Sequence, residues 1–218
     1  VPLLVGLLTT VVLLAGVIKD TLVDHPEPMA GLFLGLVVAS VLVTRRNVAW
    51  TPGRLGAGAL VAVLVFAGLG LQGAPVTDPP LLALLASGAV AVCAMVLPGI
   101  SGSFLLLMLG MYSAVIAVVD ERLLVDAAVF GIGAVVGLAC FSSVLAGLLE
   151  RRHDDVLAVM VGLMAGSLRV LWPWPYGVGV VSRHAKETVG GAGLGWPDAA
   201  GGLVVPTALA VAAVVVVL

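Results

Sequence analysis

The stretch AMVLPGISGSFLLLMLGMY, residues 94–112, places a hexapeptide that disfavours a continuous helix between two strongly apolar segments. The hexapeptide is PGISGS, residues 98–103. Proline cannot donate a backbone hydrogen bond, and glycine lets the backbone turn without a side chain in the way. We therefore predict that one helix ends before Pro98 and that another begins near Ser103, which gives a broken or re-entrant helix pair around residues 98–103.

The composition places this break in a membrane protein. Of the 218 residues, 61% are hydrophobic and only 10% are charged, and the mean hydropathy is +1.25. Soluble globular domains carry about 25% charged residues. The net charge of −2 provides no basic surface, so we expect no nucleic-acid partner and take the bilayer as the surroundings of the chain.

Apolar segments recur along the whole chain at a length close to the roughly 20 residues that a spanning helix needs. Eight of them are found, at about 1–18, 29–43, 55–71, 81–97, 104–119, 124–149, 156–171 and 203–218. Unpaired backbone groups are costly in lipid, and the segments lack the alternation of barrel strands. We therefore predict an all-α, polytopic membrane helix bundle that forms a single transmembrane domain over residues 1–218.

The ends of the chain suggest a piece of a longer protein. The sequence begins at Val1 without methionine and stops at Leu218 inside an apolar segment. The first 18 residues lack the basic leading region and the cleavage site of a signal peptide, so we expect them to belong to a spanning helix.

Basic residues in the short connections predict the orientation. Five arginines lie in the connections 44–54 and 150–155, which we place in the cytoplasm. Segment 172–202 has tryptophans near both ends and is expected to be an outer loop with interfacial aromatic residues. Cys93 and Cys140 show no metal or redox spacing, and we expect both to be small buried apolar residues.

The broken helix has the outline of an anion site. A helix that begins near Ser103 presents unpaired N–H groups at its first turn, and Ser101 and Ser103 add two hydroxyl donors. A bent helix whose serines only satisfy the interrupted backbone explains the same residues equally well. Arg169 follows in an apolar segment, where a charge is costly. It either serves as the counter-charge of an anionic headgroup or extends to the outer interface.

These residues carry a resemblance to a known family. LPGISGSF at 97–104 with LGMY at 109–112, and GLMAGSLR at 162–169 with WPWP at 172–175, together resemble the polyprenyl-phosphate transporters. The resemblance implies a multi-pass protein of the cytoplasmic membrane that moves undecaprenyl phosphate, or a related polyprenyl phosphate, for carrier-lipid recycling. Members carry two Pro-Gly-x-Ser-Gly motifs in two related halves. Only the second motif is present here, and we expect the first upstream of Val1.

The predicted lipid site combines Arg169 with the anion site at the broken helix, residues 98–103, which we call the cradle. Its substrate-binding residues are Pro98, Gly99, Ile100, Ser101, Gly102, Ser103 and Arg169. We expect no catalytic residue, no metal and no cofactor, and the sequence leaves a homo-oligomer open.

Three other functions fit parts of the same pattern. A helix-terminal cradle also suits a transporter or channel for a small soluble anion, and a groove open to lipid beside Ser101 would separate the two cases. Gly99-Ile100-Ser101-Gly102 also matches the Gly-x-Ser-Gly pattern of rhomboid-type intramembrane proteases, but the three histidines fall in predicted connections, away from a nucleophile at Ser101. A non-transporting scaffold of an envelope-synthesis complex is the third alternative.

Overall fold

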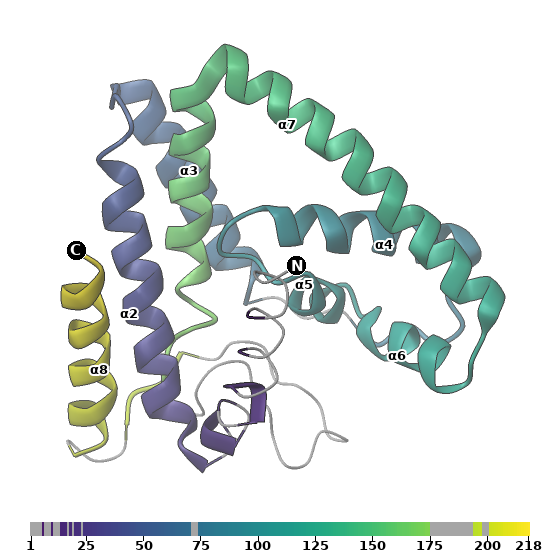
Figure 1. Ribbon diagram of the computed structural model, residues 1–218, viewed down its shortest axis with the longest axis horizontal. Helices are drawn as coiled ribbons and strands as arrows, with labels where there is room; N and C mark the ends of the chain where they lie inside the picture. Colours follow the sequence, from purple (N-terminus) through teal and green to yellow (C-terminus); the bar gives the residue numbers. More distant parts are fainter. Residues whose placement is uncertain are drawn as a thin grey trace. The chain divides into compact units, whose positions relative to one another are not determined.

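The computed structural model describes Gly6, Thr10, residues 14–16, Ile18, 20–22, 24–70, 74–174, 194–197 and 201–218. Within these residues the regular structure is helical, which confirms the predicted all-α fold. The bounds of the helices are α2 Pro26–Arg45, α3 Pro52–Gly68, α4 Leu81–Val96, α5 Gly102–Met108, α6 Tyr112–Asp120, α7 Leu124–Ser167 and α8 Gly201–Val217 (Figure 1). Two thirds of the apolar segment predicted at 1–18 lies outside the described residues, and with it the question of a signal peptide.

The helices differ in length from the eight predicted spans. By length and composition, α2 and α7 of the described chain could cross a membrane, and α5 with α6 could add a third span as a bent pair. Helices α3, α4 and α8 are apolar but have only 16 or 17 residues. The segments predicted at 124–149 and 156–171 belong to one 44-residue helix. A non-helical residue, Arg152, lies in the predicted connection 150–155, so the two predicted segments correspond to the two parts of this kinked helix.

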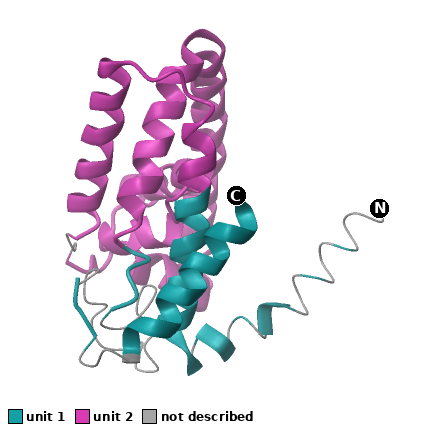
Figure 2. Cartoon of the chain, turned by 90° about the vertical axis from the view of Figure 1, so that its left-hand side faces the viewer, with its two compact units in different colours: residues 1–39, 170–218 teal, residues 40–169 magenta. Residues whose placement is uncertain are grey.

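Contacts divide the chain into two compact units, shown in separate colours in Figure 2. Unit 1 comprises residues 1–39 and 170–218, and unit 2 comprises residues 40–169. In unit 1, α2 and α8 meet without intervening side chains, because a Cβ at Gly31 would touch the backbone of Pro206 and one at Gly35 would touch that of Ala210. Small residues allow this close approach of helices.

Three tryptophans of unit 1 form a cluster at the two ends of the predicted outer loop. The ring centroid of Trp172 lies 5.5 Å from that of Trp174 and 5.7 Å from that of Trp196, both edge to face. The indole N–H of Trp172 donates to the carbonyl of Gly195 at 2.9 Å. These contacts join the two ends of the loop, most of which, residues 175–193 and 198–200, lies outside the described residues.

Unit 2 contains α4 packed along the first segment of α7, residues 124–151. The two run in the same direction, since Leu85 meets Gly133 and Ala89 meets Gly137. A Cβ at Gly137 would lie 2.6 Å from the Cα of Ala89, so the backbones touch. The thiol of Cys93 donates to the carbonyl of Gly137 at 3.6 Å.

A second pair in unit 2 joins α3 to the second segment of α7, residues 153–167. A Cβ at Gly58 would lie 2.9 Å from the carbonyl oxygen of Ala158, and one at Gly166 would lie 2.7 Å from that of Ala62. Gly162 lies against the backbone of Gly58. This pair is therefore also parallel and also in direct backbone contact.

The two segments of α7 meet at a kink. Arg152, at the kink, has φ −140° and ψ 49°, which is not helical. Figure 1 shows α7 bending between its two segments. Beside the kink, Arg54 of α3 bonds Asp155 at 2.7 Å through Nε and Asp154 at 2.9 Å through Nη1. The two arginine-containing connections predicted on one side of the membrane thus lie together at one end of this helix pair.

The cysteines differ from the prediction. Cys93 is half-buried and Cys140 is exposed, so the expectation of two buried residues is wrong for Cys140. An apolar neighbourhood in sequence does not tell whether a side chain faces another helix or lipid.

Candidate functional site

The predicted break lies where the sequence places it. Helix α4 ends at Val96, Leu97 leaves the helical conformation with φ −80° and ψ 130°, and α5 begins at Gly102. Gly99 has φ +90°, which glycine adopts far more readily than other residues. The prediction of a broken helix pair around 98–103 is therefore confirmed. We call residues 97–101 the motif turn.

The start of α5 is pressed against α4. A Cβ at Gly102 would lie 2.5 Å from the carbonyl oxygen of Ala91 and 2.8 Å from Cγ of Met95, so only glycine fits there without displacement. Gly102 is buried, while the serines on either side of it are exposed. Gly102 thus holds the backbone against α4 and leaves both hydroxyls on the open side.

The two serines form a hydroxyl pair. Their Oγ atoms lie 2.9 Å apart, and either one can be the donor. The first backbone bond of α5 runs from the N–H of Leu105 to the carbonyl of Ser101 at 3.0 Å. The N–H groups of Gly102, Ser103 and Phe104 precede this ladder and have no acceptor within the helix. Hydroxyls and amides of this kind bind phosphate or carboxylate oxygens.

Helix α5 is shorter than the sequence suggested. It has seven residues, about two turns, and is followed by a second break before α6. The two helices are bent by 112°. Gly110 makes the bend with φ +71°, and a Cβ there would touch the carbonyl of Ala74. The dipole of so short a helix is small, so the anion-binding capacity of the cradle rests on the hydroxyl pair and the nearby amides.

The motif turn packs on the second segment of α7. A Cβ at Gly99 would lie 2.9 Å from Oγ of Ser167 and 3.0 Å from Cα of Met164. Ser167 is 3% exposed, and its hydroxyl donates to the carbonyl of Met164 at 2.9 Å. Gly99 of the PGISGS motif and Ser167 of the GLMAGSLR motif, 68 positions apart in sequence, therefore meet in space. Periodicity gave no signal for this contact; the pairing of the motifs in the resemblance was the one available hint.

The side chain of Arg169 packs against the C-terminal end of α3. Its Nη1 donates to the carbonyl of Phe66 at 3.2 Å, and its guanidinium carbon lies 5.0 Å from the centroid of the Phe66 ring. A Cβ at Gly70 would touch the guanidinium. An arginine near the last carbonyls of a helix stabilises its C-terminus, and a ring face attracts the cation. The sequence did not identify Phe66 as a partner.

The predicted site residues are thus brought together in part. Pro98, Ile100 and Arg169 are half-buried, and Gly99, Ser101 and Ser103 are exposed. The motif residues form one turn, and this turn contacts the helix that leads to Arg169. The contacts described for Arg169 are with the end of α3, so its role towards a ligand stays a prediction.

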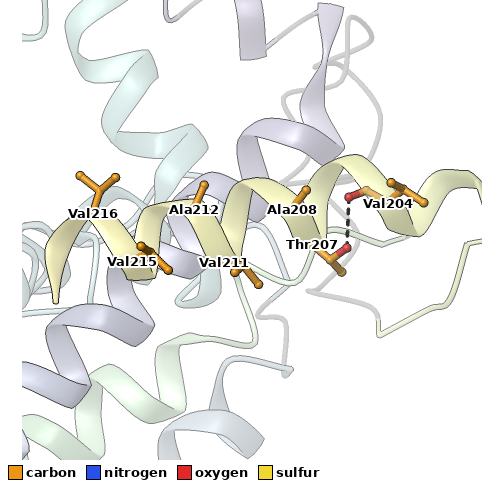
Figure 3. Close-up of a pocket in the computed structure, with 7 residues that line it drawn as sticks. All are labelled: Val204, Thr207, Ala208, Val211, Ala212, Val215 and Val216. Atoms are coloured by element: carbon orange, nitrogen blue, oxygen red, sulfur yellow. Dashed lines mark hydrogen bonds between the residues drawn. The ribbon is translucent and has the colours of Figure 1, made fainter.

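Two surface hollows lie elsewhere and contain none of these residues. One, of about 710 Å³, follows an apolar face of α8 in unit 1 (Figure 3). Its one hydroxyl, on Thr207, donates to the carbonyls of Leu203 and Val204 within the helix, which leaves a face suited to lipid tails. The other, of about 450 Å³, lies on α7 next to the kink. It is lined by Ser143, Val144, Gly147, Leu148, Arg151 and Arg152.

The described residues also bear on the alternative of a serine nucleophile and on the presence of metal ligands. No three His, Cys, Asp or Glu side chains within them gather as metal ligands would. The described hydrogen-bond partner of the Ser101 hydroxyl is Ser103. His153 contacts Asp154 at 3.7 Å beside the kink, and His184 lies outside the described residues.

Comparisons with known proteins identify relatives of the chain. Residues 1–189 match the model of a family described as undecaprenyl phosphate translocase-like. The polyprenyl-phosphate transporter of Vibrio cholerae serotype O1 is 40% identical over 171 residues, which cover 78% of this chain and 55% of that protein. The chain therefore spans about half the length of this curated relative. No solved structure matches the chain.

Proposed function

Because the chain belongs to the undecaprenyl phosphate translocase-like family, we propose that it serves to move a polyprenyl phosphate across a membrane. The lipid is undecaprenyl phosphate or a close relative, and the purpose is recycling of the carrier lipid. We further propose that the membrane is the cytoplasmic membrane, that the protein crosses it several times and that it is not an enzyme.

The observation that carries the proposal is the contact of Gly99 with Met164 and Ser167. It joins the two motifs of the resemblance into one structural element. A broken helix exposes backbone groups that lipid cannot satisfy, and membrane proteins tolerate this where the groups are buried in protein or line a cavity. Discontinuous helices are the typical substrate sites of secondary transporters.

The expected depth of the motif turn supports a site within the bilayer. Ser167 lies thirteen residues beyond Asp154 along α7, about 20 Å at the usual helical rise. Asp154 belongs to the charged end of the helix pair, which we place at the cytoplasmic interface. The hydrocarbon core is about 30 Å thick. The turn then lies well inside it, where an unaided phosphate is very unfavourable.

The chemistry of the cradle fits a phosphate monoester. Such a group carries about −1.5 to −2 charges near neutral pH. We propose that the hydroxyls of Ser101 and Ser103 and the amides of residues 102–104 replace water around its oxygens. Arg169 supplies the counter-charge, because a guanidinium stays protonated and its planar N–H groups suit phosphate oxygens. The prenyl tail stays in lipid beside the turn.

The test uses the full-length protein in vesicles that contain polyprenyl phosphate. We expect Ser101→Ala and Arg169→Ala each to lower the rate of lipid transfer between leaflets by about tenfold or more, because a hydrogen bond to a charged group contributes about 1.5–3 kcal/mol. Ser143→Ala is the matched control, since the hydroxyl of this exposed serine donates to the carbonyl of Ala139 in its own helix. It should transfer lipid at the normal rate.

The outcomes separate the candidate functions. Normal transfer by both site variants at normal protein levels would refute the assigned roles. Transfer of inorganic phosphate without transfer of the lipid would instead identify a transporter of a soluble anion. Altered partner binding with unchanged lipid distribution would favour a scaffold.

A further inference from the structure

Unit 2 contains two helix pairs, each suited to move as one body. In one pair α4 lies on residues 124–151 of α7, and in the other α3 lies on residues 153–167. Both pairs are held by direct contacts between backbones, with glycine at the crossing points. Such contacts leave little room for sliding, because a packed interface is not continuously deformable.

The connection between the pairs within α7 is a single non-helical residue. Arg152 interrupts the helix, so the chain can change direction there without breaking either pair. The ion pairs of Arg54 with Asp154 and Asp155 begin two residues later and tie the start of the second segment to α3. The two carboxylates raise the pKa of Arg54, chiefly through the hydrogen bond with Asp155, so the guanidinium stays charged.

The candidate cradle lies across the two pairs. The motif turn continues from the end of α4 and moves with the first pair, whereas Met164 and Ser167 belong to the second. The contact of Gly99 with these two residues is therefore a contact between the bodies.

We infer that rotation of the two helix pairs about Arg152 separates the motif turn from Met164 and Ser167, and that this movement opens and closes the cradle around a phosphate headgroup. The inference rests on the proposed function and adds to it the moving parts and the hinge. Ser167 lies fifteen residues beyond the hinge, about 22 Å along the helix. A rotation of roughly 10° displaces it by about 4 Å, within the range of ordinary domain hinges and enough to admit a phosphate oxygen.

Two serines provide a matched pair of reporters. Ser87 and Ser167 are both 3% exposed, and each hydroxyl donates to the carbonyl three residues earlier, at 2.8 and 2.9 Å. Ser87 lies within α4, next to Gly88, whose position is closed by the backbone of Phe130. Ser167 lies under the motif turn. Only Ser167 becomes accessible when the pairs separate.

The experiment measures thiol reactivity in the full-length protein in vesicles. In a background with Cys93→Ala and Cys140→Ala, Ser167→Cys and Ser87→Cys are treated with N-ethylmaleimide, and modification is followed by mass spectrometry. Reaction needs a solvated thiolate. We expect the thiol at 167 to react at least tenfold faster than the thiol at 87, and its rate to change at least threefold when polyprenyl phosphate is added. If Ser167→Cys is not folded, Met164→Cys, at a position that is 5% exposed, reports on the same contact.

The experiment distinguishes refutation of the hinge from refutation of the transport function. Equal protection of the two thiols in a background protein that transfers lipid would overturn the hinge and leave the function. A reactive thiol at 167 whose rate ignores the lipid, in a background protein that transfers none, would overturn the function and leave the hinge.

Discussion

Replacing Gly99 by alanine tests whether the motif turn must lie on Met164 and Ser167. Two costs arise from the structure. At φ +90° a residue with a Cβ is strained by about 1–2 kcal/mol. The new methyl group would also lie 2.9 Å from Oγ of Ser167 and 3.0 Å from Cα of Met164, against about 3.5–4.0 Å for ordinary contacts.

The steric term adds to the strain. Extra volume in a well-packed position costs about 1–3 kcal/mol. The two terms together come to about 2–5 kcal/mol against the packed turn. Even the lower value reduces the ratio of packed to displaced turn about 30-fold. If the cradle needs the packed turn to enclose a phosphate, lipid transfer should fall by a similar factor.

The assay compares Gly99→Ala with Gly131→Ala and Gly147→Ala. Both control glycines lie inside α7 with nothing within 4 Å of an added Cβ, so alanine should be neutral or stabilise the helix by up to about 1 kcal/mol. Lipid transfer in vesicles and thermal unfolding in detergent are measured for all three. A Gly99→Ala protein with the transfer rate and unfolding midpoint of the controls would refute the described contact.

Three further outcomes follow from the same structure. Gly162→Leu should separate α3 from α7, because even a Cβ there touches the carbonyl of Gly58, and both the unfolding midpoint and lipid transfer should drop sharply; normal behaviour would contradict the close pair. Arg54→Gln should lower the unfolding midpoint slightly, and the loss should shrink as salt rises, since the ion pairs are partly exposed; a loss independent of salt would exclude an electrostatic tie. Arg169→Lys should retain more lipid transfer than Arg169→Ala, because lysine keeps the positive charge, although it lacks the planar guanidinium that contacts Phe66. Equal transfer rates of the two variants would show that the charge is not what matters.

The sequence predicted the helical class and the position of the break for physical reasons that act locally. Apolar composition requires helices in lipid, and Pro98 with Gly99 interrupts the backbone hydrogen bonds of a helix at that point. The second break at Gly110 was not predicted, since a single glycine in an apolar segment is also common inside membrane helices. The kink at Arg152 was predicted as a connection, because charge marks the end of an apolar segment but does not show whether the helix resumes at once.

The parts of the site that sequence reasoning missed are contacts between distant segments. Ser167 and Phe66 are unremarkable within their own helices, and their importance comes from what packs on them: the turn at Gly99 and the guanidinium of Arg169. From the sequence alone, the glycines indicated only that helices can pack closely. The specific role of each glycine depends on the partner, because Gly58, Gly102 and Gly137 each face one particular backbone group. Local patterns therefore predict candidate site residues, whereas the contacts between distant segments come only from the three-dimensional arrangement.

In this proposal the motif contains both serines and glycines because the serines bind the phosphate and the glycines determine how the motif turn contacts its neighbours. Gly102 fixes the cradle to α4 and so determines which body carries the hydroxyls. Gly99 keeps the contact with the other body free of a side chain, so that the turn can approach Ser167 closely and leave it again. A larger residue at 102 should detach the cradle from α4, whereas one at 99 should prevent closure. The two substitutions should therefore differ in kind: Gly102→Ala should weaken phosphate binding and leave the reactivity of the thiol at 167 unchanged, and Gly99→Ala should increase the reactivity of that thiol. If both substitutions changed phosphate binding and thiol reactivity to the same extent, the motif turn and the hinge at Arg152 would not act independently.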